Sequence, residues 1–256
     1  MDLREIVSYL FSQNHSKYQI DLFDPWHFLY LFMVFGGAVL LAVLWRNKSE
    51  EAKDKLIRLM AILTIGLYVA DFFCMPLSDS YNGISQDKLP FHICTLMGVC
   101  VPFVQFNKKL APIKDVIVSL SVTSSVMWMC YPGSALGGQP PFCYQTFQTF
   151  MFHGVLYTWG FLNLALGAVT LEFRRMWRDF VGVLMILVWA AFGNAIYPND
   201  QNWFFIHSSI FDFLPDDVMP PVVVFCVCGS CFLVHCIYYA VRAILRRTEK
   251  KELATA

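Results

Sequence analysis

The segment HFLYLFMVFGGAVLLAVLW, residues 27–45, contains no Asp, Glu, Lys or Arg and is followed directly by Arg46. A helix of about 20 apolar residues is long enough to cross the roughly 30 Å hydrocarbon layer of a bilayer. The segment is therefore typical of a transmembrane helix. Six further stretches have the same character, and the sequence predicts seven spans, at about 27–45, 57–76, 90–106, 113–131, 146–169, 178–197 and 220–243.

The composition of the whole chain also indicates a protein that lies mostly in a membrane. Of the 256 residues, 57% are hydrophobic and only 15% are charged, which excludes an ordinary soluble domain and a disordered chain. Lys+Arg and Asp+Glu are equal at 19 each, so the charge argues against nucleic acid as a partner. We predict an all-α polytopic membrane protein, a bundle of seven transmembrane helices with membrane lipids as its partners.

Lysine and arginine residues are distributed unevenly between the two ends of these spans. Sixteen of the 19 follow the first, third, fifth and seventh spans, and the others are Arg4, Lys17 and Lys88. Loops rich in Lys and Arg usually stay in the cytoplasm, so we predict an N-terminus outside and a cytoplasmic C-terminus in the cell membrane. The predicted parts are an extracytoplasmic segment that can lie on the membrane surface, the seven-helix domain and a basic cytoplasmic tail, at residues 1–25, 26–245 and 246–256.

Nine cysteines cannot all pair with one another, because nine is an odd number. Cys130 and Cys143 both fall near the predicted outer face, where a disulfide between them is possible. Four cysteines in the last span alternate between helix faces and have no carboxylate close in sequence, so we expect packing thiols rather than a metal site. We predict neither a metal nor a diffusible cofactor.

Ionisable side chains inside a span are expensive, and each is therefore a candidate for function. Asp71, His92 and His153 lie in the outer half of their spans at a rise of about 1.5 Å per residue, whereas His235 lies about 22 Å along the last span. We expect His235 to be a packing residue. The other three either bond separately to neighbouring helices or form one polar site.

Helical spacing limits which of these side chains can act together. His92 and Thr95 are three residues apart and can share a face, whereas Cys94 points to a different side. His153 and Tyr157 share a face of the fifth span. The candidates for contacting a substrate are Asn194, Tyr197, Gln148, Tyr157 and Trp203.

Three short motifs carry a resemblance to a known family: LPFHIC at 89–94, FHG at 152–154 and GNAIYPNDQNW at 193–203. With seven spans, this set resembles the YwaF-like family of bacterial integral membrane proteins, which implies a bacterial plasma membrane. That family is distantly similar to eukaryotic acyltransferases that remodel ether phospholipids, and to the androgen-induced hydrolases of fatty-acid esters. These enzymes imply a Cys or Thr nucleophile and a histidine on a later helix.

Placed on this sequence, the later histidine of those enzymes matches His153. The acyltransferase nucleophile is a Cys directly before a His, and that position holds Phe91 here. Thr95 and Cys94 remain as possible nucleophiles.

Two functions fit these residues. One is a lipid acyltransferase or acyl-ester hydrolase acting on an amphiphilic substrate from the outer-leaflet half of the bilayer. In it, His153 is the general base, Thr95 or Cys94 the nucleophile, and His92 or Asn194 stabilises the oxyanion, while Asp71 orients a histidine. The other is a transporter or a protein that binds a small solute or lipid through the same polar cluster.

Overall fold

The chain folds into a bundle of long helices. The computed structural model describes residues 20–74, 86–131, 140–197, 202–206 and 215–255. All regular secondary structure in these ranges is helical, as predicted. The long helices are α2 (Pro25–Trp45), α3 (Glu50–Cys74), α4 (Ile93–Phe106), α5 (Lys114–Cys130), α7 (Tyr144–Ala165), α8 (Trp177–Ile196) and α9 (Met219–Thr255).

Two helices extend well beyond their predicted apolar spans. α3 begins at Glu50 rather than near residue 57, because ion pairs along its first turns stabilise a charged helical segment outside the apolar window. The pairs join Glu50 to Lys53, Glu51 to Lys55 and Asp54 to Arg58. α9 continues to Thr255, past the predicted end near 243. The apolar window therefore finds the part of a helix that suits lipid, not the helix end.

Five of the helices are long and apolar enough to cross a membrane, and the chain is a polytopic membrane protein. The two others are α4 and α7. α4 has 14 residues and is about 21 Å long, which is shorter than the hydrocarbon layer. α7 has 22 residues but carries several Gln, Thr, His and Asn side chains. Both elements depend on neighbouring helices to cover their polar groups.

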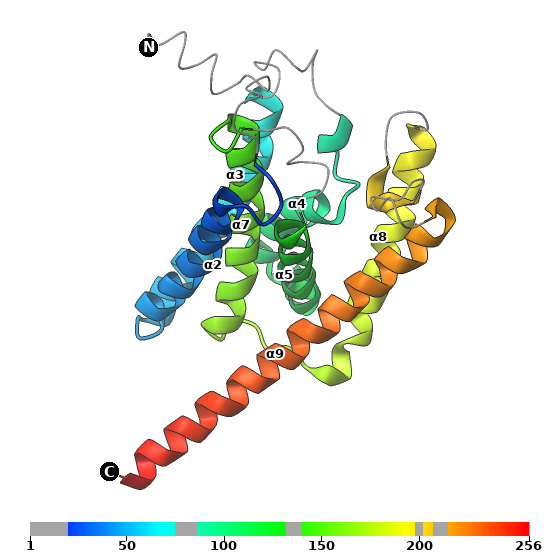
Figure 1. The fold of residues 1–256 in the computed structure, drawn as a ribbon. Coiled ribbons are helices and arrows are strands. Elements are labelled where there is room, and N and C mark those ends of the chain that lie inside the picture. Colours follow the sequence, from blue (N-terminus) through cyan, green and yellow to red (C-terminus); the bar gives the residue numbers. More distant parts are fainter. Residues whose placement is uncertain (1–19, 75–85, 132–139, 198–201, 207–214, 256) are drawn as a thin grey trace, which may run out of the picture.

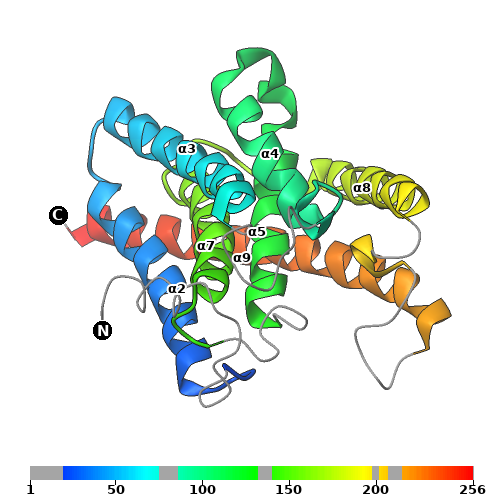
Figure 2. The same cartoon turned by 90° about the horizontal axis from the view of Figure 1, so that it is seen from above.

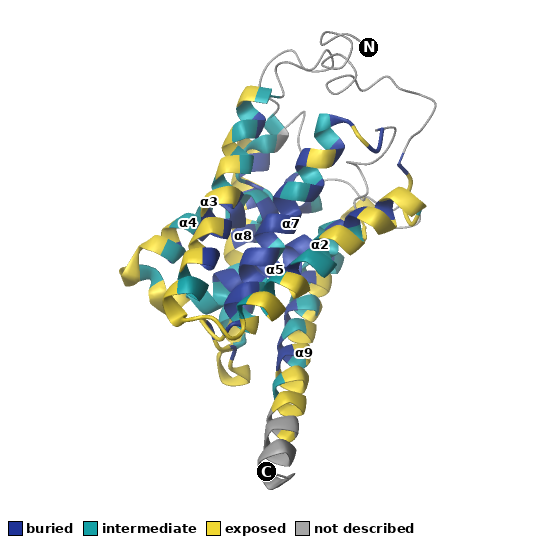
Figure 3. Ribbon diagram, turned by 90° about the vertical axis from the view of Figure 1, so that its left-hand side faces the viewer, coloured by how far each residue is buried: buried dark blue, intermediate teal, exposed yellow. Residues whose placement is uncertain are grey.

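α5 and α7 form the centre of the bundle, surrounded by α2, α3, α4, α8 and α9 (Figure 2). Ten of the 17 residues of α5 and 13 of the 22 residues of α7 are buried, against three of 21 in α2 (Figure 3). The buried face of α5 includes a run of Ser and Thr side chains between 119 and 125. This polar span therefore lies inside the bundle rather than against lipid.

Glycines on α7 allow two helices to approach it closely. A Cβ at Gly154 would lie 2.6 Å from Val34 Cγ2 on α2, and one at Gly160 would lie 2.7 Å from Val122 Cγ2 on α5. Both distances are far below van der Waals contact. Small residues at helix contacts are a common way to bring backbones together in membranes.

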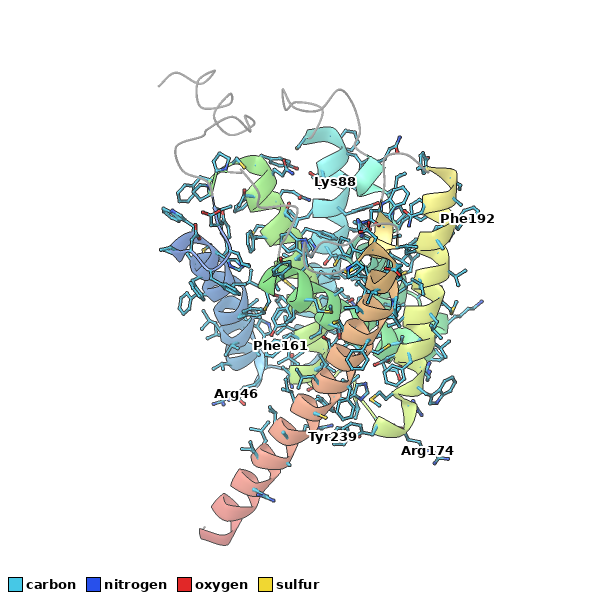
Figure 4. All side chains as sticks on the ribbon, turned by 45° about the vertical axis from the view of Figure 1, so that its right-hand side comes forward. Arg46, Lys88, Phe161, Arg174, Phe192 and Tyr239 are labelled. Carbon is cyan, nitrogen blue, oxygen red and sulfur yellow. The ribbon has the colours of Figure 1, made fainter. Side chains whose placement is uncertain are left out.

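α9 crosses the bundle obliquely and runs past it at its C-terminal end (Figure 1). It contacts α5 and α8 on the way. Lys88 lies at one end of the bundle, while Arg46 and Arg174 lie at the opposite end (Figure 4). Most of the predicted surface segment 1–25 falls outside the described residues, and so do most side chains of the predicted tail 246–256.

Candidate active site

Ionisable side chains from α3, α7 and the segment before α4 interact near Lys88, which lies at one end of the bundle (Figure 4). His153 on α7 interacts electrostatically with Lys88 and His92, and Lys88 forms an ion pair with Asp71 on α3. We refer to Asp71, Lys88, His92 and His153 as the His153 cluster. The sequence left open whether these residues form one polar site or bond separately to neighbouring helices, and a single site stays a prediction.

His153 has one ring nitrogen fixed and one left open. Its Nδ1 lies 2.7 Å from the carbonyl oxygen of Thr149, one turn earlier in α7. Because a carbonyl can only accept a hydrogen bond, Nδ1 carries the proton, and the neutral ring has its lone pair on Nε2. Within the described part of the chain, Nε2 makes no hydrogen bond, although the side chain is only 7% exposed.

Aromatic rings hold the imidazole of His153 in place. The indole of Trp128 on α5 stacks on it with ring centroids 4.0 Å apart and planes 11° apart, and Phe152 contacts it edge-on at 5.2 Å. A stacked indole also stabilises a protonated imidazole through its negative ring face. The two aromatic contacts therefore fix the orientation of the His153 ring.

Asp71 interacts with a lysine rather than with a histidine. Its Oδ2 lies 2.8 Å from Lys88 Nζ, and the carboxylate is almost completely buried. One turn earlier in α3, the Tyr68 hydroxyl donates to the Lys88 carbonyl at 2.7 Å. The Tyr144 hydroxyl also interacts with Asp71 and with Cys74. α3 thus fixes Lys88 through both its side chain and its backbone, and the predicted role of Asp71 in orienting a histidine has no counterpart in this geometry.

The turn before α4 positions His92, which is the N-cap residue of that helix. The Thr95 hydroxyl donates to the carbonyl oxygens of His92, at 3.0 Å, and Leu89, at 3.3 Å. Trp189 on α8 donates from its indole to the Pro90 carbonyl at 2.8 Å. Thr95 therefore closes the turn, and its proton is used by the backbone.

Phe91 points away from the His153 cluster and into the contact with α8. A Cβ at Gly193 would lie 2.5 Å from the Phe91 ring, which also stacks on Trp189 at 5.0 Å and packs on Trp203 at 4.7 Å. The position that corresponds to a Cys nucleophile in the acyltransferases is thus occupied by a packing ring.

Cys94 is the second predicted nucleophile, and its contact in the structure is with α5. Its thiol is buried and hydrogen-bonds with Ser124 on α5. Across the described residues, no hydrogen bond joins His153 to Thr95 or Cys94. Among the described residues, His153 therefore lies near Lys88 and His92 and forms no hydrogen bond with either predicted nucleophile.

Asn194 holds the backbone of Trp203. Its Nδ2 donates to the Trp203 carbonyl at 2.9 Å, and its Oδ1 accepts from the Trp203 N–H at 3.0 Å. Phe204 and Phe205 follow with φ of 59° and 53°, values that bulky residues rarely adopt. Tyr197 packs edge-on against the buried Trp203 ring at 5.7 Å, and Phe205 lies 5.9 Å from His92. Asn194 therefore stabilises a strained aromatic segment beside His92.

Gln148 and Tyr157, the other predicted substrate residues, contact neighbouring helices. Gln148 donates to the Leu67 carbonyl on α3 at 3.4 Å. Tyr157 packs between Phe35 on α2 and Phe161 in its own helix. Both side chains contribute to helix packing in this conformation.

The nine cysteines form no disulfide in the described structure, and this includes Cys130 and Cys143. The Cys143 sulfur instead caps α7, where it accepts from the Thr146 N–H at 3.5 Å, and Cys130 is exposed. The suggested disulfide between them is not formed. In the ranges described, no group of three His, Cys, Asp or Glu side chains could hold a metal ion.

Two residues of this site were not recognised in the sequence. Lys88 looked like an ordinary loop charge. Its one unusual feature in the sequence is that it falls on the predicted outer side, where Lys and Arg are rare. Trp128 looked like one more apolar residue of its span. Its contact with His153 depends on helix packing, which local sequence does not encode.

A bundle of apolar helices with an ionisable cluster in its interior defines a polytopic α-helical membrane protein. A family model narrows this class further: the TMEM164 family matches residues 22–241, and the chain belongs to this family of eukaryotic multi-pass membrane proteins. No curated protein and no solved structure matches the chain.

The predicted membership of the YwaF-like family is therefore wrong. That resemblance depended on three short motifs, which together cover few of the 220 or so positions that the family model spans. Their residues also have structural roles, since Phe91 packs on Gly193 and Asn194 binds Trp203. Such contacts can recur in unrelated bundles. The bacterial plasma membrane was implied by the same resemblance and loses its support with it.

Proposed function

We propose that this protein is a membrane-embedded lipid acyltransferase or acyl-ester hydrolase with His153 as its general base. One observation carries the proposal: Nδ1 of His153 is fixed on a backbone carbonyl, while Nε2 keeps its lone pair with no hydrogen bond among the described residues. A buried imidazole in this state can accept a proton from a hydroxyl placed against Nε2. Fixing the other nitrogen selects the tautomer that this chemistry needs.

In the proposed reaction, the attacking hydroxyl comes from the reactants. It belongs to an acceptor lipid in acyl transfer or to water in hydrolysis. Nε2 takes the hydroxyl proton as the oxygen bonds to the acyl carbonyl carbon, and the imidazolium returns the proton to the leaving oxygen as the old ester bond breaks. This route requires neither Thr95 nor Cys94 to move towards His153.

Lys88 supports the proposal as a source of positive charge beside the base. Its ammonium interacts electrostatically with His153 and is held by Asp71 at 2.8 Å. A positioned cation stabilises the negative oxygen that develops on an acyl carbonyl. Asn194, an earlier candidate for that role, has both polar atoms of its side chain bonded to the Trp203 backbone. We therefore assign oxyanion stabilisation to Lys88, with His92 as a second candidate.

The proposed substrate is an amphiphilic membrane lipid. The His153 cluster lies among helices whose outward surfaces are rich in exposed Phe, Leu and Val side chains, as a lipid environment requires. An ester group near the membrane surface can reach the N-terminal parts of α4 and α7 without leaving the bilayer.

The direct test is acyl-group turnover by the purified full-length protein in lipid nanodiscs. The lipids include a labelled acyl donor and a lysophospholipid acceptor, and mass spectrometry measures transferred and free fatty acid. His153→Asn keeps a donor at the position of Nδ1 but has no counterpart of Nε2, so we expect it to lower turnover by about 10²- to 10⁴-fold. Thr149→Val leaves the backbone carbonyl in place and serves as the matched control. Turnover that is unchanged in His153→Asn would contradict the proposal.

A second candidate is a transporter or a binding protein for a small solute or lipid, without covalent chemistry. It is favoured by the lack of any hydrogen bond between His153 and Thr95 or Cys94 in the described structure. This function predicts saturable binding of a lipid or solute with no acyl product, and binding that weakens in Lys88→Gln. Formation of acyl product at a constant rate over many turnovers would show that the protein does more than bind or transport a ligand.

We also propose seven crossings with the N-terminus outside and the C-terminus in the cytoplasm, which places the His153 cluster in the outer-leaflet half. The placement of Arg46 and Arg174 at the end opposite Lys88 supports this orientation (Figure 4). Epitope tags at the two termini test it. The N-terminal tag should bind antibody on sealed vesicles of known orientation, and the C-terminal tag only after permeabilisation.

A further inference from the structure

A second buried polar cluster joins α5, α8 and α9, away from the His153 cluster. The Ser119 hydroxyl on α5 donates to Asp179 Oδ2 on α8 at 2.6 Å, and His235 Nε2 on α9 lies 3.0 Å from the same oxygen. The three residues, which we refer to as the Asp179 cluster, are at most 3% exposed. His235 is thus paired with a carboxylate and is more than the packing residue that the sequence suggested.

The hydrogen bonds indicate the charge state of Asp179. One oxygen that accepts from a hydroxyl and also contacts a ring nitrogen is the arrangement expected of an ionised carboxylate. Nε2 of His235 then carries a proton and donates it to Oδ2. The carboxylate charge lies inside the bundle, where an unpaired charge is strongly unfavourable.

The groups that face this carboxylate supply no permanent positive charge within the described residues. α5 contributes Ser119, and α9 contributes the thiols of Cys228 and Cys231 together with His235. Phe173, in the short helix η4 (Phe173–Arg175), packs its ring 5.8 Å from that of His235. The neighbouring Arg178 instead pairs with Asp115 at 2.9 Å. His235 is therefore the side chain in contact with Asp179 that can become its counter-ion.

Nδ1 of His235 is the atom that can take the required proton. It is buried and has no hydrogen-bond partner among the described residues. A proton there converts His235 into an imidazolium and makes the pair with Asp179 electrically neutral.

We propose that the Asp179 cluster is a proton-binding site, in which one proton held by His235 forms a buried imidazolium–carboxylate pair that joins α9 to α8. This site is separate from the acyl chemistry proposed for His153. Its ligand is the proton itself, and its occupancy determines whether the contact between α8 and α9 is an ion pair or a carboxylate without a counter-ion.

The charge of His235 can be measured in the full-length protein in nanodiscs by ¹⁵N NMR after histidine labelling. At pH 7 we expect a charged imidazolium, with both ring nitrogens protonated, whose signals disappear in His235→Gln and persist in His153→Asn. In Asp179→Asn we expect His235 to become neutral. A neutral His235 in the wild-type protein at pH 7 would overturn the proposal.

A variant cycle tests the same site even if one variant folds poorly. His235→Gln keeps a donor at the position of Nε2 but cannot take a proton, so it leaves Asp179 without a counter-ion. We expect it to raise the unfolding equilibrium constant about a hundredfold, and Asp179→Asn in the same chain to reverse most of that loss. Ser119→Ala, which removes a hydrogen bond and no charge, is the matched control. If His235→Gln alone is as stable as the double variant His235→Gln/Asp179→Asn, no charged pair is present.

Discussion

His27 and His153 are both buried, and both contact the last turn of α5 through adjacent residues, Met129 and Trp128. Their hydrogen bonds differ. His27 Nε2 donates to the Met129 carbonyl at 2.8 Å, and its Nδ1 accepts from the Phe23 N–H at 3.0 Å. In the part of the chain that the structure describes, His153 forms a hydrogen bond through Nδ1 but not through Nε2. Both ring nitrogens of His27 are satisfied by the backbone, whereas Nε2 of His153 has no hydrogen bond within the described ranges.

The surroundings of His27 explain why it is structural. It lies in the first turn of α2, where the Asp24 carboxylate accepts from its N–H at 2.6 Å. Its hydrogen bond with the Phe23 N–H stabilises a residue with φ of 64°. The neighbouring Tyr30 hydroxyl donates to the Pro141 carbonyl at 2.6 Å. His27 therefore links a strained turn, α2 and α5. A buried histidine in a membrane bundle is informative about chemistry only after both of its nitrogens have been accounted for.

The largest effect that would separate the two histidines is on turnover. We expect His153→Asn to lower kcat by about 10²- to 10⁴-fold, the usual contribution of a general base, while the free energy of unfolding changes by less than about 1 kcal/mol. Turnover in nanodiscs and thermal unfolding of the same samples measure both quantities. If the loss of kcat is accompanied by a loss of several kcal/mol in the free energy of unfolding, His153 is a structural residue like His27.

His27→Ala should show the opposite pattern. It leaves the Met129 carbonyl and the Phe23 N–H without partners, and we expect a loss of about 2 to 4 kcal/mol in the free energy of unfolding. Turnover per folded molecule should stay unchanged. Tyr30→Phe, which removes one hydrogen bond from the same region, is a milder control and should cost about 1 kcal/mol. A His27 variant that folds normally but has no activity would contradict this assignment.

Gly193→Ala tests whether the turn that carries His92 depends on close packing, as the turn at His27 depends on hydrogen bonds. The added Cβ would lie 2.5 Å from the Phe91 ring, so we expect a loss of about 1 to 3 kcal/mol in the free energy of unfolding. Adding Phe91→Leu should recover part of it. If Gly193→Ala alone is neutral, Phe91 is not fixed against α8.

The smallest expected effect concerns Trp128, whose ring stacks on His153 and not on His27. Trp128→Leu removes the stack on His153, and we expect it to weaken the protonated form by about 0.5 to 1.5 kcal/mol, or up to roughly tenfold in kcat. Trp128→Phe keeps an aromatic face and should have less effect. The readout is the ratio of kcat values for the two variants, and a ratio of one would show that the stack has no part in the reaction.

The fold could be read from the sequence because the membrane requires long apolar helices. The starts of six predicted spans lie within about three residues of the first residue of a helix. The exception is α3, which begins earlier, in a segment that its ion pairs stabilise. The candidate site was harder. Depth along a helix brought Asp71, His92 and His153 to one level, but the partner of Asp71 depends on where the segment before α4 folds back.

The Asp179 cluster shows a further limit of the sequence. Asp179 is one residue inside its predicted span and follows Arg174, Arg175 and Arg178, so it resembled one more charge at a membrane surface. In the structure, Arg178 pairs with Asp115, and Asp179 turns inward to Ser119 and His235. Which of two adjacent charges enters the bundle is decided by helix rotation, a property of tertiary packing.

The oblique course of α9 makes the protein sensitive to the thickness of its membrane. Its apolar stretch, Asp216–Leu245, has 30 residues and measures about 45 Å, against roughly 30 Å of hydrocarbon. A helix that is longer than the bilayer adjusts by tilting, and a thinner membrane demands more tilt. Because His235 joins α9 to α8, a change in tilt acts on the contact with Asp179. A mismatch between helix length and membrane thickness therefore strains the buried pair of His235 and Asp179.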